Sequence, residues 1–369
     1  MSLKKTNYAF VIDGFTRGGA QQVILELIRE FRKFSNCEFS IVLLQNHDHE
    51  IEVPEDMKWL QVFRIDAKNI LDFKAFIRFF KLILDQRFNS IICNLYWSQI
   101  WGAITASILN VGVLWVEHNT YKNRTKLQWK VFEFLSKRTN SIVSVSNDVK
   151  TFLLDYRINS HVILNPVRSI ENYLSTRNEY PTFIFIGRLV PQKRPLLVVE
   201  SLSLALKESL LPKSTILEIF GEGPLLKVLQ LRVTELAIEK NVIFRGFVPN
   251  HQLRRELSRA HTLISTSEFE GFALSRIEAV ATGLCVISTA TGGFRETFFN
   301  DNLNQFPRGI FQVDPDPAEI GNIMANSINE QYWTRECIQV RQSIIEKFSP
   351  EFSSKEYLTL LTNNLNPKT

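Results

Sequence analysis

Cysteine is scarce in this sequence. Its 369 residues include only Cys37, Cys93, Cys285 and Cys337, and no two of them form a CxxC pair. A closely spaced, even set of cysteines would indicate a disulfide framework, which small secreted domains use in place of a large core. The scattered cysteines instead indicate ordinary buried thiols in a protein of a reducing compartment.

Long apolar runs are also lacking. No stretch approaches the about 18 consecutive apolar residues expected of a membrane-spanning helix. The basic N-terminus leads into an apolar run, but Asp13 interrupts that run after a few residues. The segment therefore has the pattern of a first β-strand rather than of a signal peptide, and we expect a cytoplasmic protein.

Neither sign of charge is in large excess. The formal net charge of +5 permits an anionic partner such as a nucleotide, a lipid phosphate or a phospholipid surface, but it is too small to indicate nucleic acid. Apolar residues make up 45% of the chain and charged residues 22%, which is typical of a globular protein with a large core. The length favours about two domains.

Short β-branched or aromatic runs alternate with stretches of helical period, which is the pattern of repeated βαβ units. Strands are expected near 8–12, 39–44, 60–65, 91–95, 114–117, 142–145, 162–164, 183–186, 216–220, 242–244, 263–265, 285–288 and 310–313. A polar segment with proline near each end, 165–181, is the expected linker. The sequence therefore predicts an α/β protein with two Rossmann-like, doubly wound domains, 1–168 and 178–348, facing a central crevice.

Two glutamates stand out in the stretch 261–297. Glu270 follows an apolar strand, and Glu278, after seven intervening residues, is expected near the start of the next helix. Because parallel sheets bind ligands along the carboxyl ends of their strands, both carboxylates are expected to face one crevice. Taken alone, the pair also fits the acid and base of a glycoside hydrolase.

Cations follow another strand of the second half. Arg188, Lys193 and Arg194 come directly after it, beside Gly187. The planar guanidinium of arginine and the compact ammonium of lysine together suit a diphosphate. A solvated charge run is the alternative. Two further strand-end turns contain Glu222 and Phe247, and the second of these could contact a base or be a plain turn.

The first half contains a glycine loop and a histidine at strand ends. Gly18 and Gly19 open a helix, where free N–H groups suit an anion, although the spacing matches neither the dinucleotide fingerprint nor the P-loop, and a tight turn explains it equally well. A lone histidine is more often structural than catalytic, but His118 stands at the carboxyl end of an expected strand, which strengthens the case for a functional role. Ser146 is a predicted helix N-cap.

Two patterns that could suggest a metal are set aside. Asp314 and Asp316 spell D-x-D, but they lie in a proline-rich loop ahead of a helix, where aspartate commonly caps or turns the chain. His47 and His49 in a polar loop are a weak metal signal. We expect no metal site.

A basic stretch rich in aromatics, 122–138, contains six cations against Glu133 alone. Such a helix can lie on an anionic membrane surface, or it can be a solvated helix with one buried face. The helix expected over 73–88 has a charged stripe and is expected to pack on its sheet.

Together these motifs resemble the retaining glycosyltransferases of family 4, which have the GT-B fold. The similarity covers nearly the whole chain and lies in the segments Arg17–Val23, Glu117–Asn119, Val145–Lys150, Gly187–Pro195, Gly221–Leu225, Ser267–Ala279 and Thr291–Glu296. The segment 348–361 also resembles the last helices of that family, which return to the first domain, so that 349–369 is expected to pack there.

The resemblance implies a nucleotide-sugar donor, UDP- or GDP-linked, with no separate cofactor and no divalent metal. Arg188 and Lys193 would hold the diphosphate, Glu278 the ribose hydroxyls and Glu270 the transferred sugar. His118 would lie near the anomeric centre. The remaining donor contacts would come from Gly18, Gly19, Gly187, Glu222, Phe247, Gly271 and Phe272. The acceptor would be a glycan or lipid-linked molecule of bacterial surface polysaccharide synthesis, reached at the inner face of the cell membrane.

Two residues depart from the family pattern: Ala273 replaces a common proline, and Arg276 replaces a common apolar residue. These changes leave the donor sugar open. A GT-B-fold epimerase or phosphorylase and a non-enzymatic nucleotide-sugar- or sugar-binding protein remain as alternatives.

Overall fold

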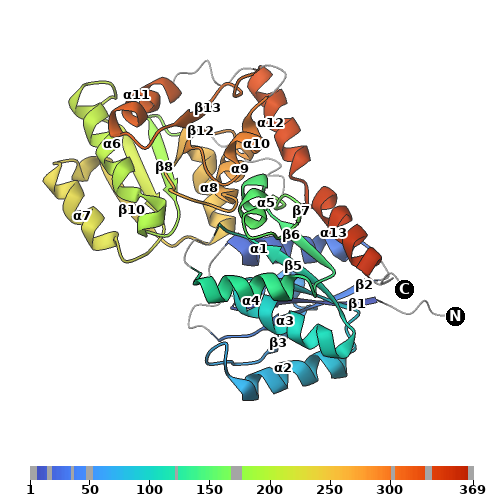
Figure 1. The fold of residues 1–369 in the computed structure, drawn as a ribbon. Coiled ribbons are helices and arrows are strands. Elements are labelled where there is room, and N and C mark those ends of the chain that lie inside the picture. The colour runs from blue at the N-terminus through green and yellow to red at the C-terminus, as the bar shows by residue number, and fades with distance from the viewer. Residues whose placement is uncertain are drawn as a thin grey trace. The chain divides into compact units, whose positions relative to one another are not determined.

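The computed structural model describes residues 6–14, 19–34, 37–46, 53–120, 124–167, 177–300, 304–328 and 335–364. The chain divides into two compact units (Figure 1). Unit 1 comprises Met1–Arg168 and Phe348–Thr369, and unit 2 comprises Ser169–Lys347. None of the helices in the described residues has both the length and the apolar composition that a bilayer span requires.

Unit 1 is built on a seven-stranded parallel sheet of order β3-β2-β1-β4-β5-β6-β7. Its strands are β1 (Thr6–Ile12), β2 (Cys37–Leu43), β3 (Gln61–Arg64), β4 (Ser90–Asn94), β5 (Gly112–Glu117), β6 (Ser141–Ser144) and β7 (His161–Val162). Residues in the middle of β1, β2, β4, β5 and β6 are almost fully buried, as expected when helices cover both faces of a sheet, whereas the edge strands β3 and β7 are partly exposed.

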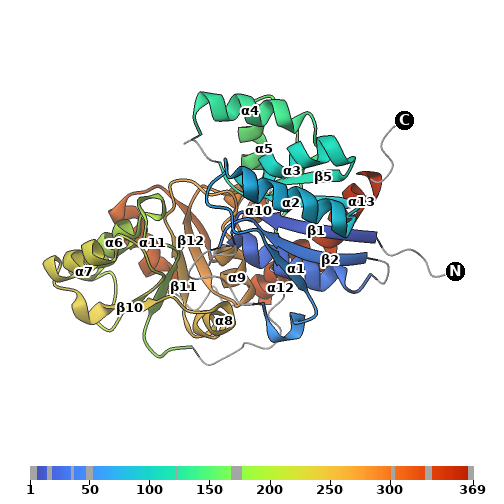
Figure 2. The ribbon, with the colours of Figure 1, turned by 90° about the horizontal axis from the view of Figure 1, so that it is seen from below.

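The helices of unit 1 form a layer on each face of this sheet (Figure 2). They are α1 (Gly19–Phe31), η1 (Glu55–Met57), α2 (Phe73–Gln86), α3 (Tyr96–Leu109), α4 (Lys126–Ser136), α5 (Asn147–Leu154) and α13 (Pro350–Asn364). The last helix contacts α1 and β5, and Ser353 Oγ donates to the Leu164 carbonyl at 2.9 Å. The predicted cap is confirmed, since Ser146 Oγ accepts from Val149 N at 3.2 Å.

Unit 2 is a six-stranded parallel sheet of order β10-β9-β8-β11-β12-β13. Its strands are β8 (Thr182–Ile186), β9 (Ile216–Phe220), β10 (Val242–Gly246), β11 (Thr262–Ser265), β12 (Cys285–Thr289) and β13 (Ile310–Val313). Its helices are η2 (Pro191–Lys193), α6 (Pro195–Lys207), α7 (Leu226–Glu235), η3 (Glu239–Asn241), α8 (Asn250–Arg259), α9 (Leu274–Ala281), α10 (Phe294–Phe298), α11 (Pro317–Ser327) and α12 (Arg335–Lys347). The predicted α/β class with two Rossmann-like units is confirmed.

The strand order reverses once in each unit. In unit 1 the chain leaves the middle of the sheet in opposite directions from β1 and β4, and in unit 2 from β8 and β11. The loops that follow such neighbouring strands diverge to opposite faces and leave a crevice between them, which is where open α/β sheets bind ligands. A ligand site is therefore expected at the carboxyl ends of β1 and β4 in unit 1 and of β8 and β11 in unit 2.

Candidate active site

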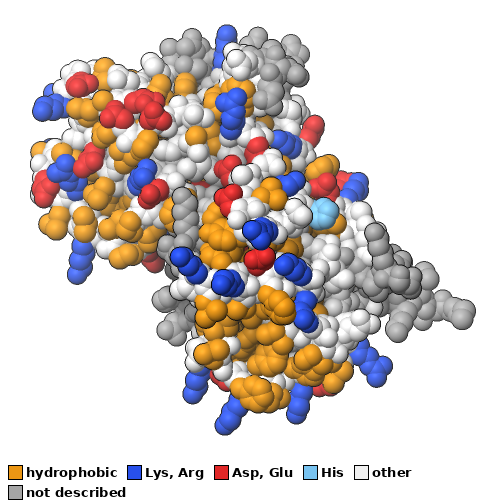
Figure 3. Space-filling view, in the orientation of Figure 1, with side chains coloured by type: hydrophobic (Ala, Val, Ile, Leu, Met, Phe, Trp, Pro, Cys, Tyr) orange, Lys and Arg blue, Asp and Glu red, His pale blue; other side chains and the backbone are white. Residues whose placement is uncertain are grey.

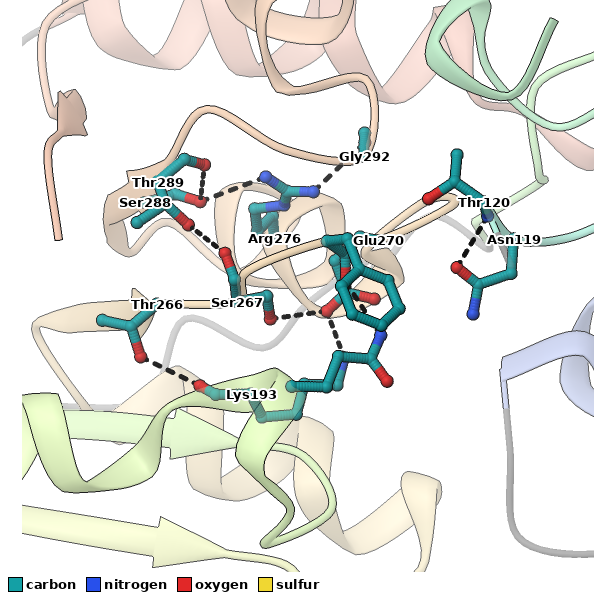
Figure 4. A network of polar contacts seen from close by, with 12 residues as sticks. Asn119, Thr120, Lys193, Thr266, Ser267, Glu270, Arg276, Ser288, Thr289 and Gly292 are labelled. Carbon is teal, nitrogen blue, oxygen red and sulfur yellow. Dashed lines mark hydrogen bonds and ion pairs between the residues drawn. The ribbon is translucent and has the colours of Figure 1, made fainter. Parts of the chain in front are cut away.

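An ion pair crosses the switch point of unit 2. Lys193 ends η2 after β8, Glu270 lies in the loop after β11, and the Lys193 ammonium contacts the Glu270 carboxylate directly (Figure 4). Ser267 Oγ donates to the same carboxylate oxygen at 2.7 Å. The structure thus brings together two predicted site residues that are 77 positions apart.

The two loops that carry this pair are fastened to each other. Thr266 Oγ1 donates to the Lys193 carbonyl at 3.0 Å, and Gln192 Nε2 donates to the Phe269 carbonyl at 2.8 Å. Backbone Glu268 N also donates to the Gln192 carbonyl at 2.8 Å. Because side chain and backbone both hold the loops, the ammonium and the carboxylate are preorganised rather than freely rotating.

The pair is largely shielded from water. The Lys193 side chain is 20% exposed and that of Glu270 is 10% exposed. Burial alone would raise the pKa of Glu270, but the charge and hydrogen bond of Lys193 and the hydrogen bond of Ser267 outweigh it, so that the pKa lies below its ordinary value. Glu270 is therefore an ionised hydrogen-bond acceptor at neutral pH.

Arg276, which the sequence marks only as a departure, supports the same loops from α9. It is 2% exposed, and it donates to Ser288 Oγ at 3.0 Å and to the Gly292 carbonyl at 3.1 Å (Figure 4). Its charge also contributes to the low pKa of Glu270. Thr289 Oγ1 completes the support by donating to the Ser267 carbonyl at 2.7 Å.

Glycines let the neighbouring loops approach closely. Gly221 has φ +139, and a Cβ there would lie 1.9 Å from the Gly187 carbonyl oxygen. Leu189 N donates to the Glu222 carbonyl at 2.8 Å, and Phe247 N donates to Glu222 Oε1 at 3.4 Å. The loops after β8, β9 and β10 therefore form one connected edge that contains three predicted donor-site residues: Gly187, Glu222 and Phe247.

Several helices that begin at this edge have no side-chain cap. None is present at the N-termini of α6, α7, α9 and α10, whereas Asp316 caps α11 by accepting from Glu319 N at 2.8 Å. Backbone N–H groups in the first turn of a helix have no intrahelical partner, and the helix dipole favours negative charge there. The edge is therefore suited to an anion.

The other predicted residues of unit 2 lie in the loops after β8 and β11 and in helix α9. Arg188 is exposed, and among the described residues no ion pair joins it to a carboxylate. Gly271 and Phe272 lead into α9, and Glu278 is 9% exposed. Glu278 occupies the second turn of this helix rather than its start, because the chain runs extended through Ala273 before the helix begins.

Unit 1 places His118 directly after β5. Its Nε2 lies 2.9 Å from Asn94 Oδ1, at the end of β4. Because the Asn94 amide nitrogen donates to the Ile92 carbonyl at 3.1 Å, its oxygen faces the ring, and Nε2 carries the proton. Burial lowers the pKa of His118 to about 4. The ring is thus neutral at pH 7 and presents Nδ1 as an acceptor.

The switch point of unit 1 is held by residues that the sequence did not single out for this role. Asp13 accepts from Ser98 N at 2.7 Å and from Trp97 N at 3.1 Å, which caps α3, and burial raises its pKa to about 6. Glu117, 1% exposed, pairs with Arg124 Nη2 at 3.0 Å. Beyond His118, Thr120 N donates to Asn119 Oδ1 at 2.9 Å (Figure 4).

The remaining predictions for unit 1 concern the glycine loop. Gly19 is the first residue of α1, and Gln21 Nε2 donates to the Gly14 carbonyl at 2.9 Å, which ties the helix to the end of the first strand. Gly18, like His47 and His49, lies outside the described residues.

We expect replacement of His118 with glutamine to flatten the acid side of the stability profile. The unfolded chain protonates His118 near pH 6.5 but the folded chain only near 4, so the unfolded state binds more protons in this window and stability falls as pH falls. The loss avoided by the variant is up to roughly 3 kcal/mol at pH 4.

Thermal melts of both proteins at steps from pH 7.5 to 4.5 measure this effect. Asp13, whose raised pKa acts in the opposite sense between pH 3.8 and 6, is common to both proteins and cancels. Parallel profiles for the two proteins would show that His118 is not held neutral.

Two Rossmann-like units, each with a polar cluster at its switch point, define the class of GT-B-fold proteins. The model of the family described as "Glycosyltransferase Family 4" matches residues 17–169, and that of "Glycosyl transferases group 1" matches residues 168–342. Together the two models cover residues 17–342, so the chain consists of a family 4 domain followed by a group 1 domain of glycosyltransferases, in agreement with the glycosyltransferase resemblance of its motifs.

Among curated relatives, the chain is 24% identical over 291 residues to a poly(ribitol-phosphate) alpha-N-acetylglucosaminyltransferase of Staphylococcus aureus. This match covers 77% of the chain and 57% of that protein. A UDP-Gal:alpha-D-GlcNAc-diphosphoundecaprenol alpha-1,3-galactosyltransferase of Escherichia coli is 25% identical over 250 residues, which is 60% of the chain and 63% of the relative. The chain thus spans less than two thirds of each relative.

The fold is also that of solved structures. Anabaena HepE in complex with UDP superimposes with a TM-score of 0.81 at 16% identity, covering 97% of this chain and 100% of that one.

Proposed function

We propose that the protein is a glycosyltransferase that moves a sugar, with retention of anomeric configuration and without a divalent metal, from a UDP- or GDP-linked donor. The acceptor is a glycan or a lipid-linked molecule of bacterial surface polysaccharide synthesis, reached from the cytoplasm at the inner membrane face. The observation that carries this proposal is the preorganised Lys193–Glu270 pair at the switch point of unit 2. The similarity to a poly(ribitol-phosphate) glycosyltransferase and to a galactosyltransferase named for a diphosphoundecaprenol-linked sugar supports it.

The roles follow from charge. As the bond between the anomeric carbon and the diphosphate oxygen breaks, negative charge develops on the leaving group. An ammonium has three N–H donors, so Lys193 can keep Glu270 and still bind a phosphate oxygen. Exposed Arg188 and the uncapped helix N-termini add positive potential at the same edge. Such fixed charges stabilise the transition state because the protein groups already point at the developing charge and need not reorient as the bond breaks.

The carboxylates orient the donor rather than transfer protons. Glu270 is held ionised by Lys193, so it accepts hydrogen bonds from sugar hydroxyls and is no general acid. We assign Glu278 to the ribose hydroxyls, and Gly271 and Phe272 to backbone contacts with the donor. Neutral His118 offers Nδ1 to a sugar hydroxyl. Gly18, Gly19, Gly187, Glu222 and Phe247 complete the proposed donor contacts.

A transfer assay tests the proposal. The purified protein is incubated with a panel of UDP- and GDP-sugars and a membrane extract, with and without EDTA, and the release of nucleoside diphosphate and the anomeric configuration of the product are measured. We expect release from one donor class, an axial linkage matching the donor, and no effect of EDTA. An inverted product or loss of activity in EDTA would contradict retention or metal independence. Interconversion of the donor sugar without transfer would instead indicate an epimerase.

A further inference from the structure

The outer surface of three helices in unit 1 forms one apolar patch. Helices α2, α3 and α4 lie side by side on one face of the sheet (Figures 1 and 2). The Phe76 and Trp101 rings, 5.4 Å apart, join α2 to α3, and the Tyr96 and Phe132 rings, 6.1 Å apart, join α3 to α4. Figure 3 shows the hydrophobic side chains gathered over these helices.

Each helix contributes large apolar side chains that point to solvent. On α2 Phe73 is 71% exposed, on α3 Ile108 is 64% exposed, and on α4 Leu127 and Phe134 are 71% and 57% exposed. Burial in the core does not explain these residues, because Phe79, Trp101 and Phe132 already fill the inner faces. A contiguous exposed apolar surface of this kind marks an interaction site.

The charges around this patch are mostly of one sign. Helix α3 has no charged residue, and the flanking helices carry exposed Lys74 and Lys81 on α2 and Lys126 and Lys130 on α4. Lysine and arginine side chains border the patch in Figure 3. The acidic side chains of these helices are Asp85 and Glu133, and Glu133 lies 3.5 Å from Lys137.

We propose that this three-helix face docks on an anionic lipid bilayer. The apolar side chains would enter the headgroup region and the lysines would contact lipid phosphates, as in interfacial amphipathic helices. A second copy of the chain is a poorer occupant, because self-pairing of the face would bring lysines against lysines. The sequence pattern indicates this contact only for 122–138, whereas the structure extends it to α2 and α3. The inference rests on the proposed transfer to a lipid-linked acceptor, which it places at the membrane.

Vesicle sedimentation without donor tests the proposal, using equimolar phosphatidylglycerol and phosphatidylcholine against phosphatidylcholine alone. One variant replaces Lys74, Lys81, Lys126 and Lys130 with glutamine. A second replaces Ile108 and Ile104, the latter 36% exposed on the same helix α3, with serine and changes no charge. The matched control replaces four exposed lysines of unit 2 with glutamine: Lys207, Lys213, Lys227 and Lys240.

We expect the native protein to bind the anionic vesicles selectively. Each lysine of the face contributes about fivefold in affinity, so the first variant should lose on the order of several hundredfold, the second at least about tenfold, and the control much less than the first. Equal losses in the first variant and the control would overturn the proposal, as would absence of native binding. A native dimer that the second variant dissociates would assign the face to self-association instead. Melting curves of the same samples show whether a variant that fails to bind vesicles is still folded. Transfer to a water-soluble acceptor shows whether the proposed activity is present when vesicle binding is lost.

Discussion

Replacement of Lys193 with alanine is expected to lower kcat/KM by roughly 10²–10³-fold, the usual effect of removing one preorganised group that stabilises developing negative charge. The variant loses the cation at the switch point of unit 2 and leaves Glu270 buried without it. We therefore also expect the free energy of unfolding to fall by about 3–5 kcal/mol, because an uncompensated buried charge remains. Steady-state kinetics and urea unfolding measure the two effects.

Two further variants separate chemistry from folding. Lys207→Ala removes an exposed cation from the last turn of α6 and should change neither property appreciably. The double variant Lys193→Ala/Glu270→Gln removes both charges and should recover much of the stability while remaining inactive. Near-normal turnover of Lys193→Ala would remove the ion pair from the mechanism.

Replacement of Gly292, in the loop after β12, with alanine is expected to displace Glu270 and Arg276. Gly292 has φ +58, and an added Cβ would lie 2.5 Å from Glu270 Cβ and 2.9 Å from Arg276 Nη2. The left-handed backbone and the overpacking together should lower the free energy of unfolding by roughly 2–5 kcal/mol. A displacement of Glu270 by an ångström should lower kcat/KM about 10²-fold.

Gly246→Ala is the matched control. Gly246 has a similar φ of +65, but the nearest atom to an added Cβ is Glu222 Oε1 at 3.8 Å. This variant should therefore show only the cost of the left-handed backbone, about 1–2 kcal/mol. Equal losses of stability and activity in both variants would show that the contact with Glu270 is unimportant.

Much of the fold could be predicted because its signals are local. Each strand expected from a short β-branched run is present, with boundaries that differ by a few residues. Ser146 caps α5 as predicted, and Asp316 caps α11, which agrees with its interpretation as a helix cap. Propensity and capping act over a few neighbouring residues, so one sequence is enough to show them.

The site was less accessible because its contacts join distant segments. Their positions at the ends of strands predicted Lys193 and Glu270 as site residues. Their direct contact depends on β8 and β11 being neighbours in the sheet, and the spacing of residues in the sequence does not predict that order. Gly292 lies in the segment Thr291–Glu296 that resembles the family, but its contact with Glu270 is seen only in the structure. Glu278 was expected near a helix start and lies in the second turn.

Arg276 and Asp13 show a second limit. A charged residue in an amphipathic helix is normally expected to face solvent, yet Arg276 is buried because the Ser288 hydroxyl and the Gly292 carbonyl accept its hydrogen bonds. Asp13 interrupts an apolar run and suggests only a strand end, whereas it caps α3 more than 80 positions away. Helix α2 was expected simply to pack on its sheet, and its exposed Phe73 appears only in the structure.

If the edge of unit 2 that contains Lys193 binds a nucleoside diphosphate, that ligand should raise the thermal stability of the protein. A ligand that binds only the folded state raises stability by RT ln(1 + [L]/Kd), about 2.7 kcal/mol at a concentration 100 times Kd. Melting curves with UDP, GDP and the matching monophosphates are compared for the native protein, Lys193→Ala and Lys207→Ala. We predict that one diphosphate stabilises the native protein and Lys207→Ala well beyond its monophosphate, and that Lys193→Ala loses this difference. Equal stabilisation by mono- and diphosphate, or an undiminished difference in Lys193→Ala, would show that Lys193 does not hold the diphosphate.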